Sequence, residues 1–327
     1  MRKALVEEMK YVYGGKEGGT VDVMVEDVAL AAGCNAAFMA AVIAIAERGD
    51  EVILPTPWYF NNQMTLQMLG IGIIPLPVSI EDGFTPKIEV AEALITPRTR
   101  ALVLVSPNNP TGVVYSPSLL RSFSDLTSRH NIALILDETY RDFVAPGPPH
   151  DLFVHGNWRS NLVHLFSFSK SYRVPGHRLG AIVGGKAVLE NVYKVLDSRP
   201  LQIALAPLLP SLRSDLADQS VELSTRHDIF RQTLLQHPSS GWQVGSSGAY
   251  FALVKHPFKG VHATEVCRRL AEECGVVLLP LSFFAPSHDS AWDAWIRVSV
   301  ANVGPDALRD AAVRLRESGK LLNWEIP

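Results

Sequence analysis

Short apolar runs alternate along the first two thirds of the chain with longer segments of helical periodicity. The strand-like runs lie at 50–57, 101–112, 132–140, 162–170 and 180–185. Helical patterns stand between several of them, at 59–69, 117–129 and 186–197. Continuous apolar strands separated by helices are typical of a parallel sheet that is buried on both faces. The pattern therefore predicts an α/β fold, with a mostly parallel sheet sandwiched by helices.

The pattern changes after about residue 200. A long, polar helical stretch at 212–235 leads into a region where shorter strand-like and helical segments alternate. The strand-like segments are 248–254, 275–280 and 294–300, and the helical ones lie near 263–273 and from 305 to about 318. We expect a large domain over residues 1–215 and a smaller α+β domain over residues 216–327.

One apolar segment, 28–46, is nearly long enough to cross a bilayer. It is rich in alanine, and Gly33, Cys34 and Asn35 interrupt it where a strand could turn into a helix. We interpret it as a buried strand, a tight turn and a buried helix, and expect no membrane span. Residues 1–20 carry no secretory pattern.

Composition and charge narrow the classes of function. The 327 residues are 47% hydrophobic and 19% charged, as in a globular protein, and the formal charge of −3 gives no sign of a nucleic-acid partner. Three cysteines, Cys34, Cys267 and Cys274, are too few and too scattered for a disulfide framework or a metal site. A cytoplasmic location is expected, because such a chain fits a reducing compartment.

Polar residues gather at the carboxyl ends of the predicted strands, where parallel sheets bind their ligands. "SFSK" is one of these ends, and it places Lys170 directly after an apolar run. A lone lysine is most often a solvated surface charge. Partial burial, however, lowers the pKa of a lysine and frees its amine for Schiff-base chemistry with an aldehyde. Ser167 and Arg178 nearby could hold a phosphate, so the stretch points to pyridoxal phosphate.

Three motifs then carry a resemblance: "NNPTG" at 108–112, "LDETY" at 136–140 and "SFSKSYRVPGHRLG" at 167–180. In this order they resemble the class I and II aminotransferases, which are fold-type I pyridoxal-phosphate enzymes. The resemblance covers residues 2 to about 318. It implies that Lys170 forms the Schiff base with the cofactor. It also implies that Asn109 and Tyr140 bond the phenolic oxygen of the cofactor, and that Asp137 faces its pyridine nitrogen.

Each role has a physical reason and a plainer alternative. An ionised Asp137 keeps the ring nitrogen protonated, so that the ring can accept the electrons left at the α-carbon of the substrate. Asp137 could otherwise be a helix cap, and Asn109 a turn residue. Arg297 lies in an apolar run, where the alternative is an internal ion pair with a carboxylate. The resemblance implies that Arg297, with Asn109, binds the α-carboxylate of the substrate.

The remaining predicted cofactor contacts surround the phosphate and the ring. Gly33, Cys34 and Asn35 precede a helix whose free amides suit an anion. Ser169 and Arg178 are expected to join Ser167 at the phosphate. Tyr59 is expected to stack on the ring, with Trp58 as the alternative for that role. The predicted cofactor-binding set is Gly33, Cys34, Asn35, Tyr59, Asn109, Asp137, Tyr140, Ser167, Ser169, Lys170 and Arg178.

The resulting expectation is an aminotransferase for an L-amino acid and a 2-oxo acid, with Lys170, Asp137 and Tyr140 as catalytic residues. Apolar "SFF" and "GAYF" suggest an aromatic or large apolar side chain on the substrate. The same residues also serve pyridoxal-phosphate lyases and ring-closing enzymes that make a cyclopropane amino acid, and a catalytically silent relative is a further alternative. The resemblance implies a homodimer. Relatives usually carry several dozen residues before the helix that here begins at Arg2, including a substrate-contacting loop and a tyrosine that reaches the phosphate of the partner subunit. A truncated gene model, a fragment and an enzyme that closes its site differently are the alternatives.

Overall fold

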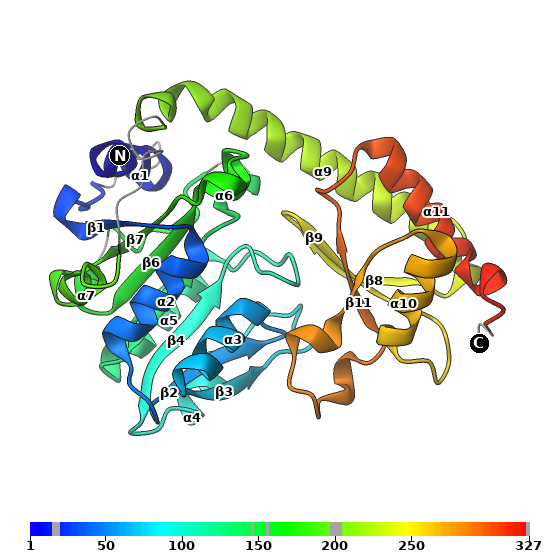
Figure 1. The fold of residues 1–327 in the computed structure, drawn as a ribbon, viewed down its shortest axis with the longest axis horizontal. Helices are drawn as coiled ribbons and strands as arrows, with labels where there is room; N and C mark the ends of the chain where they lie inside the picture. Colours follow the sequence, from blue (N-terminus) through cyan, green and yellow to red (C-terminus); the bar gives the residue numbers. More distant parts are fainter. Residues whose placement is uncertain (15–19, 145–146, 155–156, 197–204, 325–327) are drawn as a thin grey trace.

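The computed structural model describes residues 1–14, 20–144, 147–154, 157–196 and 205–324. The chain forms a large α/β part and a smaller α+β part (Figure 1). A long helix, α9 (Arg213–Leu235), runs alongside both parts. The domain boundary expected near residue 215 falls in the first turn of α9 and stays a prediction, because that helix packs against elements of both parts.

The large part is built on a seven-stranded sheet in the order β1-β7-β6-β5-β4-β2-β3. Its strands are β1 (Val28–Ala31), β2 (Glu51–Thr56), β3 (Gly72–Pro77), β4 (Thr99–Val105), β5 (Ala133–Asp137), β6 (Leu162–Ser167) and β7 (Gly180–Gly184). The strands β3, β2, β4, β5 and β6 are parallel to one another, whereas β7 is antiparallel to both β6 and β1. The predicted mostly parallel sheet is confirmed.

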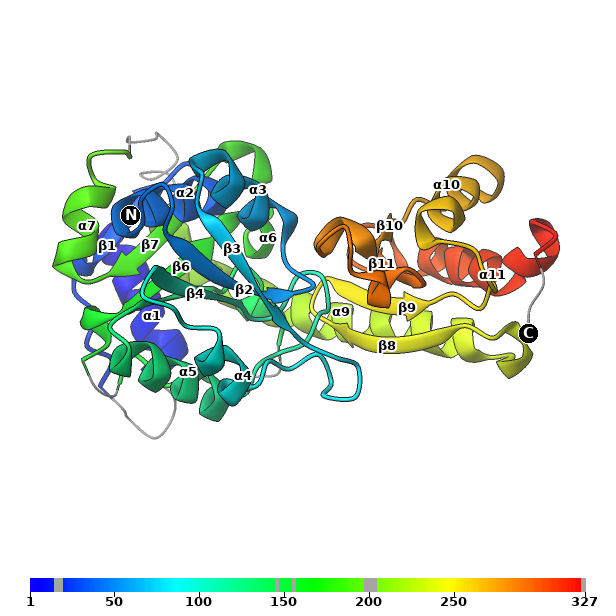
Figure 2. The ribbon, with the colours of Figure 1, turned by 90° about the horizontal axis from the view of Figure 1, so that it is seen from below.

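Helices cover both faces of this sheet, because its central strands are apolar on both sides. One face packs against α1 (Arg2–Gly14), α4 (Ile88–Ala93) and α5 (Pro117–Arg129). The other face packs against α2 (Cys34–Ile45), α3 (Phe60–Leu69) and α7 (Lys186–Val192). Figure 2 shows α2 and α3 on one side of the sheet and α4 and α5 on the other. The expected strand, turn and helix over 28–46 are β1 and α2.

The small part contains an antiparallel sheet in the order β10-β11-β9-β8. Its strands are β8 (Gln243–Gly248), β9 (Phe251–Lys255), β10 (Leu279–Pro280) and β11 (Trp295–Ser299). The helices α10 (Ala263–Cys274) and α11 (Pro305–Leu321) pack on it together with the second half of α9. This arrangement confirms the predicted α+β part.

The reversal of β7 decides where the site forms. Parallel strands end at one edge of the sheet, and an antiparallel neighbour begins at that same edge. Gly180, the first residue of β7, therefore pairs both with Ser167 at the end of β6 and with Ala31 at the end of β1. The segment between β6 and β7, which contains Lys170 and Arg178, stays at this edge.

No helix among the residues that the structure describes is long and apolar enough to span a membrane. The long helix α9 is polar along most of its length, and α2, the most apolar, has only 12 residues.

Candidate active site

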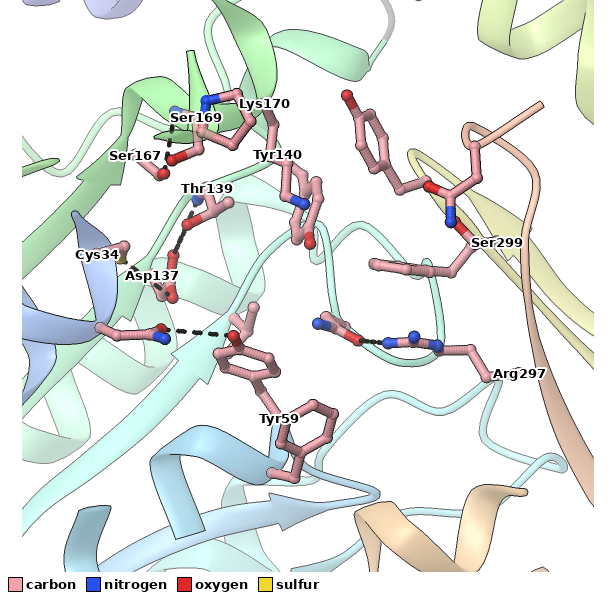
Figure 3. A pocket seen from close by; sticks show the side chains of 18 of the residues that line it. Cys34, Tyr59, Asp137, Thr139, Tyr140, Ser167, Ser169, Lys170, Arg297 and Ser299 are labelled. Atoms are coloured by element: carbon pink, nitrogen blue, oxygen red, sulfur yellow. Dashed lines mark hydrogen bonds between the residues drawn. The ribbon is translucent and has the colours of Figure 1, made fainter. Parts of the chain in front are cut away.

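A cavity of about 330 Å³ lies between the edge of the large sheet and the small part (Figure 3). Its volume is in the range of small-molecule and cofactor sites. The side chains that line it are Cys34, Asn35, Tyr59, Phe60, Val105, Asn109, Asp137, Thr139, Tyr140, Ser167, Ser169, Lys170, Pro175, Arg178, Tyr250, Phe251, Arg297, Ser299 and Asn302. Every residue predicted for the site lines this cavity except Gly33, which packs against one of its walls.

Lys170 lies in α6 (Phe168–Ser171), a single helical turn that begins where β6 ends. Ser167 caps this turn, because its Oγ accepts a hydrogen bond of 3.2 Å from the amide of Ser169. Burial, and then the charge of Arg297, lower the pKa of the Lys170 ammonium. Among the described residues no carboxylate pairs with Lys170, so nothing in this part of the chain offsets that effect. The amine is thus disposed to lose its proton.

Asp137 ends β5 and is almost fully buried. Its Oδ1 accepts hydrogen bonds from the amide of Thr139 (2.9 Å) and from the Thr139 hydroxyl (2.7 Å), and its Oδ2 accepts one from the Cys34 thiol (3.5 Å). Burial raises the pKa of Asp137, while the donors on Thr139 and Cys34 oppose that rise. No cation pairs with Asp137 among the described residues. A buried carboxylate of this kind is best satisfied by a cationic ligand group.

The part of the cavity near Gly33 and Arg178 is suited to an anion. Gly33 precedes α2 with φ of 87°, and the first helical hydrogen bond runs from the amide of Ala37 to the Gly33 carbonyl. The amides of Cys34 and Asn35 therefore come before the first bonded turn. A Cβ on Gly33 would lie 2.2 Å from Nη2 of Arg178, so only glycine allows this close approach.

Arg178 holds its place through backbone oxygens. Its guanidinium donates to the carbonyls of Pro175 (2.9 Å) and Ala32 (3.4 Å), and no carboxylate of the described residues pairs with it. Its charge is available to a ligand. Together with the hydroxyls of Ser167 and Ser169, which also face the cavity, it provides donors for a phosphate.

Two tyrosines, Tyr59 and Tyr140, also line the cavity. Tyr59 directly precedes α3, and its hydroxyl accepts a hydrogen bond from Asn61 (2.8 Å) and donates one to Asn35 (3.4 Å). Tyr140 packs against Tyr250, with 5.2 Å between the ring centroids, and burial raises the pKa of its hydroxyl. Both tyrosines are thus neutral donors at the cavity wall. Trp58, the alternative to Tyr59, is buried and does not line the cavity.

Arg297 projects from β11 on the opposite side of the cavity (Figure 3). Its Nη1 donates to Oδ1 of Asn109 at 3.0 Å, and its guanidinium lies over the rings of Phe251 (4.6 Å) and Phe284 (4.9 Å). Its Nε is buried without a hydrogen-bond partner. No carboxylate among the described residues pairs with Arg297, so an internal ion pair is not seen there. A half-buried guanidinium with spare donors suits a carboxylate ligand.

The sequence did not single out several residues of the cavity. Thr139 holds Asp137 in place and lies inside "LDETY", so the motif contained a signal that only the hydrogen bonds explain. Tyr250 and Phe251 belong to the "GAYF" run that suggested an aromatic wall. Ser299 lies two residues after Arg297 on β11, a spacing that places both on one face of the strand. Nothing in the sequence signalled Phe60, Val105, Pro175 and Asn302.

Known proteins share both this sequence pattern and this fold. The family described as aminotransferase class I and II matches residues 1–315. The chain belongs to this family. Members of the family depend on pyridoxal phosphate, so the protein is a pyridoxal-phosphate-dependent aminotransferase. The buried carboxylate, the lowered lysine pKa and the anion-binding turn agree with the cofactor that the family implies.

Similar proteins differ in the substrates that their names give. The chain is 29% identical to an arginine–pyruvate transaminase of Pseudomonas aeruginosa, over 96% of this aminotransferase and 79% of the relative. It is 29% identical to an aromatic aminotransferase of Arabidopsis thaliana, over 89% of this chain and 74% of the relative. Among solved structures, N-succinyldiaminopimelate aminotransferase from Mycobacterium tuberculosis matches with a TM-score of 0.84 and 27% identity, covering 96% of this chain and 82% of that one.

Proposed function

We propose that this aminotransferase moves an amino group between an L-amino acid with an aromatic or large apolar side chain and a 2-oxo acid. The observation that carries the proposal is that one cavity contains both Lys170 and Arg297, neither paired with a carboxylate of the described residues. An amine and a guanidinium on opposite walls match the two ends of an amino acid, the α-carbon with its nitrogen and the α-carboxylate.

The large part would hold the cofactor. The amides that follow Gly33, the hydroxyls of Ser167 and Ser169, and Arg178 would bind its phosphate, while Asp137 would face the ring nitrogen. Tyr59 would pack on the ring, and Asn109 and Tyr140 would bond its oxygen. When bound, pyridoxal phosphate holds the substrate nitrogen covalently and accepts the electron pair left when a bond to the α-carbon breaks.

Lys170 would move the proton. With its pKa lowered by burial and by Arg297, its neutral amine would take the proton from the α-carbon and would deliver it to the cofactor carbon on the other side of the substrate nitrogen. A positioned base of this kind contributes roughly 100- to 10,000-fold to the rate. The Tyr140 hydroxyl, whose pKa is raised by burial, stays protonated and donates a hydrogen bond without competing for that proton.

Arg297 would orient the substrate. Two parallel hydrogen bonds from a guanidinium fix both oxygens of a carboxylate, and Asn109 already holds one of the Arg297 nitrogens at 3.0 Å. The rings of Phe251 and Phe284 below the guanidinium keep water from its face. The carboxylate would therefore set the position of the α-carbon relative to Lys170.

The proposed side-chain preference is supported by the aromatic lining. Tyr59, Phe60, Tyr250 and Phe251 all face the cavity, and no acidic group other than Asp137 does so among the described residues. The name of the Arabidopsis relative, an aromatic aminotransferase, points the same way. A cationic substrate side chain would find no partner there beyond the carboxylate already committed to the ring.

The test is a panel of the twenty amino acids with the cofactor-loaded protein. We expect spectral change and 2-oxo acid formation with phenylalanine, tyrosine, tryptophan, leucine or methionine, and at least tenfold lower kcat/KM with aspartate and lysine. A preference for charged side chains would contradict the proposed substrate class. Release of ammonia in place of amino transfer would favour the lyase alternative, and no change with any amino acid would favour the silent relative.

We also propose a cytoplasmic homodimer. The neighbouring helices α2 and α3 expose apolar side chains, namely Met39, Ile43, Met64 and Met68. Exposed apolar groups on adjacent helices are typical of interfaces between subunits. Sedimentation should give a mass close to twice 35.8 kDa, and substitution of Met64 and Met68 by glutamate should lower it toward that of a monomer.

We also propose the domain limits 1–215 and 216–327.

A further inference from the structure

The turn at 248–250 forms part of the cavity wall and has an unusual backbone. It joins β8 to β9 and presents Tyr250 and Phe251 to the cavity. The Nζ of Lys170 lies 5.5 Å from the centre of the Tyr250 ring, and Phe251 lies under Arg297. At Ala249 the φ angle is 44°, in the left-handed region that residues with a Cβ rarely adopt. The surroundings must therefore hold this residue in place.

On the cavity side the turn fits tightly against the "NNPTG" loop. A Cβ on Gly112 would lie 2.6 Å from the carbonyl oxygen of Gly248, and a Cβ on Gly248 would lie 2.3 Å from that of Gly112. Two backbones in such contact move together. The same loop carries Asn109, which holds Arg297. A shift of the turn would therefore disturb the guanidinium proposed to bind the substrate.

Behind the turn there is a second cavity, of about 420 Å³, lined in part by Phe143, Val144, Ser247 and Ala249. Ala249 packs with Phe143 and Leu223 in a small apolar cluster, but the space behind the turn leaves this packing incomplete. A polar contact from α9 adds to it. His227 approaches the carbonyl of Ala249, with 2.8 Å between Nε2 and the oxygen, and its Nδ1 contacts the Ser247 hydroxyl.

These contacts define the state of the ring. A carbonyl can only accept, so Nε2 carries the proton and donates, and in the neutral ring Nδ1 accepts from the Ser247 hydroxyl. Burial lowers the pKa of His227, while the bond to Ala249 opposes that shift, so the neutral ring is the form that fits. His227 is thus hydrogen-bonded both to Ser247, which precedes the turn, and to Ala249 within it.

We propose that His227 is a positioning residue for the transamination reaction. By its bond to the Ala249 carbonyl it holds the left-handed turn that sets Tyr250, Phe251 and, through the "NNPTG" loop, Arg297. The turn also contacts the residue that follows β11, because the amide of Val300 donates to the Tyr250 carbonyl at 3.0 Å. His227 touches neither substrate nor cofactor, and it acts on substrate binding from α9.

The test compares His227→Ala with His227→Gln, which keeps an N–H donor near the position of Nε2. The matched control is Arg231→Ala, one turn further along α9 and lining the same second cavity. Hydrogen exchange is measured on the cofactor-free protein. In His227→Ala we expect faster exchange in peptides that cover 248–254 and 297–302. Exchange in β4 and β5 should stay unchanged, and His227→Gln and Arg231→Ala should match the wild type.

The kinetic arm rests on the proposed function and uses the best amino donor of the panel. Loss of the hydrogen bonds to Ala249 and Ser247 should raise KM about fivefold in His227→Ala, with kcat within about twofold, because Lys170 and Asp137 stay in place. The His227→Gln variant should have a KM close to that of the wild type. Unchanged exchange and KM in His227→Ala, exchange that rises throughout the sheet, or a Gln variant as impaired as the Ala variant would each overturn the inference. The hydrogen-exchange measurement tests whether His227 holds the turn even if no amino acid reacts.

Discussion

The two walls of the active-site cavity are built in different ways. On the wall of the large part, Asp137, Lys170 and Arg178 follow or precede strands of one sheet, and their partners lie on the same wall, as Thr139 and Cys34 do for Asp137. On the wall of the small part, Arg297 donates its hydrogen bond to Asn109 across the cavity. The wall proposed to hold the cofactor supports itself, whereas the wall proposed to hold the substrate depends on contacts between the two parts.

This difference separates two kinds of change. A substitution on the self-supporting wall should act on cofactor chemistry and leave the opposite wall intact. A substitution at the contacts between walls should act first on substrate affinity, since the guanidinium of Arg297 loses its orientation. Four experiments can break or sharpen this distinction.

The largest effect is expected for Lys170→Ala. Removal of the amine that carries the proton should lower kcat at least about 1,000-fold and abolish the visible absorbance of the lysine-bound cofactor. Absorbance scans and single-turnover rates measure both. Lys186→Ala on the exposed start of α7 serves as the control and should behave as the wild type. An unaltered spectrum in Lys170→Ala would exclude the assigned role.

Arg297→Ala should act mainly on substrate affinity. Charged hydrogen bonds contribute enough that their loss is expected to lower kcat/KM about 100-fold, chiefly through KM, while the cofactor spectrum stays normal. Arg297→Lys keeps the charge but loses the planar fork, so its defect should be smaller yet clear. If Arg297→Ala lost the cofactor instead, the division between the walls would be wrong.

The two walls also communicate through charge. Lys170 must lose its proton to condense with pyridoxal phosphate, so the loading rate of the cofactor-free protein should rise with pH, reach half of its maximum at the pKa of Lys170 and level off above it. Burial and Arg297 both lower that pKa, so the midpoint should lie below the pKa of an ordinary lysine, about 10.4. Arg297→Gln should move the rise to higher pH. Stopped-flow absorbance tests this, and an unmoved profile would contradict the coupling.

The smallest effect is expected at Cys34. Burial, and then Asp137, raise the pKa of its thiol, so it remains a protonated donor to Oδ2. Cys34→Ala leaves Asp137 its two bonds from Thr139 and should weaken cofactor binding only about threefold. Cys34→Ser keeps a donor and should bind more tightly than the Ala variant. Equal affinity in the two variants, measured by cofactor titration, would argue against this hydrogen bond.

The same contrast explains how much the sequence predicted. The strands of the large sheet are continuous apolar runs with polar motifs at their ends, so both the α/β fold and the group around Lys170 and Asp137 could be expected. Two strands were missed for physical reasons. β3 is an edge strand that contains Pro75 and Pro77, which weaken the strand pattern, and β8 is polar and rich in glycine.

Contacts between the walls were beyond sequence reasoning. Arg297 stood out as a charge in an apolar run, but its bond to Asn109 joins residues that are far apart in the chain. The left-handed Ala249 and the role of His227 behind it depend on a backbone angle and a cavity, neither of which leaves a signal in residue type. Local motifs could be recognised in the sequence, whereas contacts between segments that are distant in the chain required the structure.

The antiparallel course of β7 has a consequence for how such a site can change over time. Because the chain turns back at once after β6, Lys170 and Arg178 share one short connection whose two ends are fixed by adjacent strands. An insertion there would separate the amine proposed to react from the cation proposed to hold the phosphate, whereas loops of the small part other than the turn at 248–250 can lengthen without touching either. New substrate preferences can therefore arise by altering one side of the molecule, while the spacing of the chemical groups is inherited unchanged.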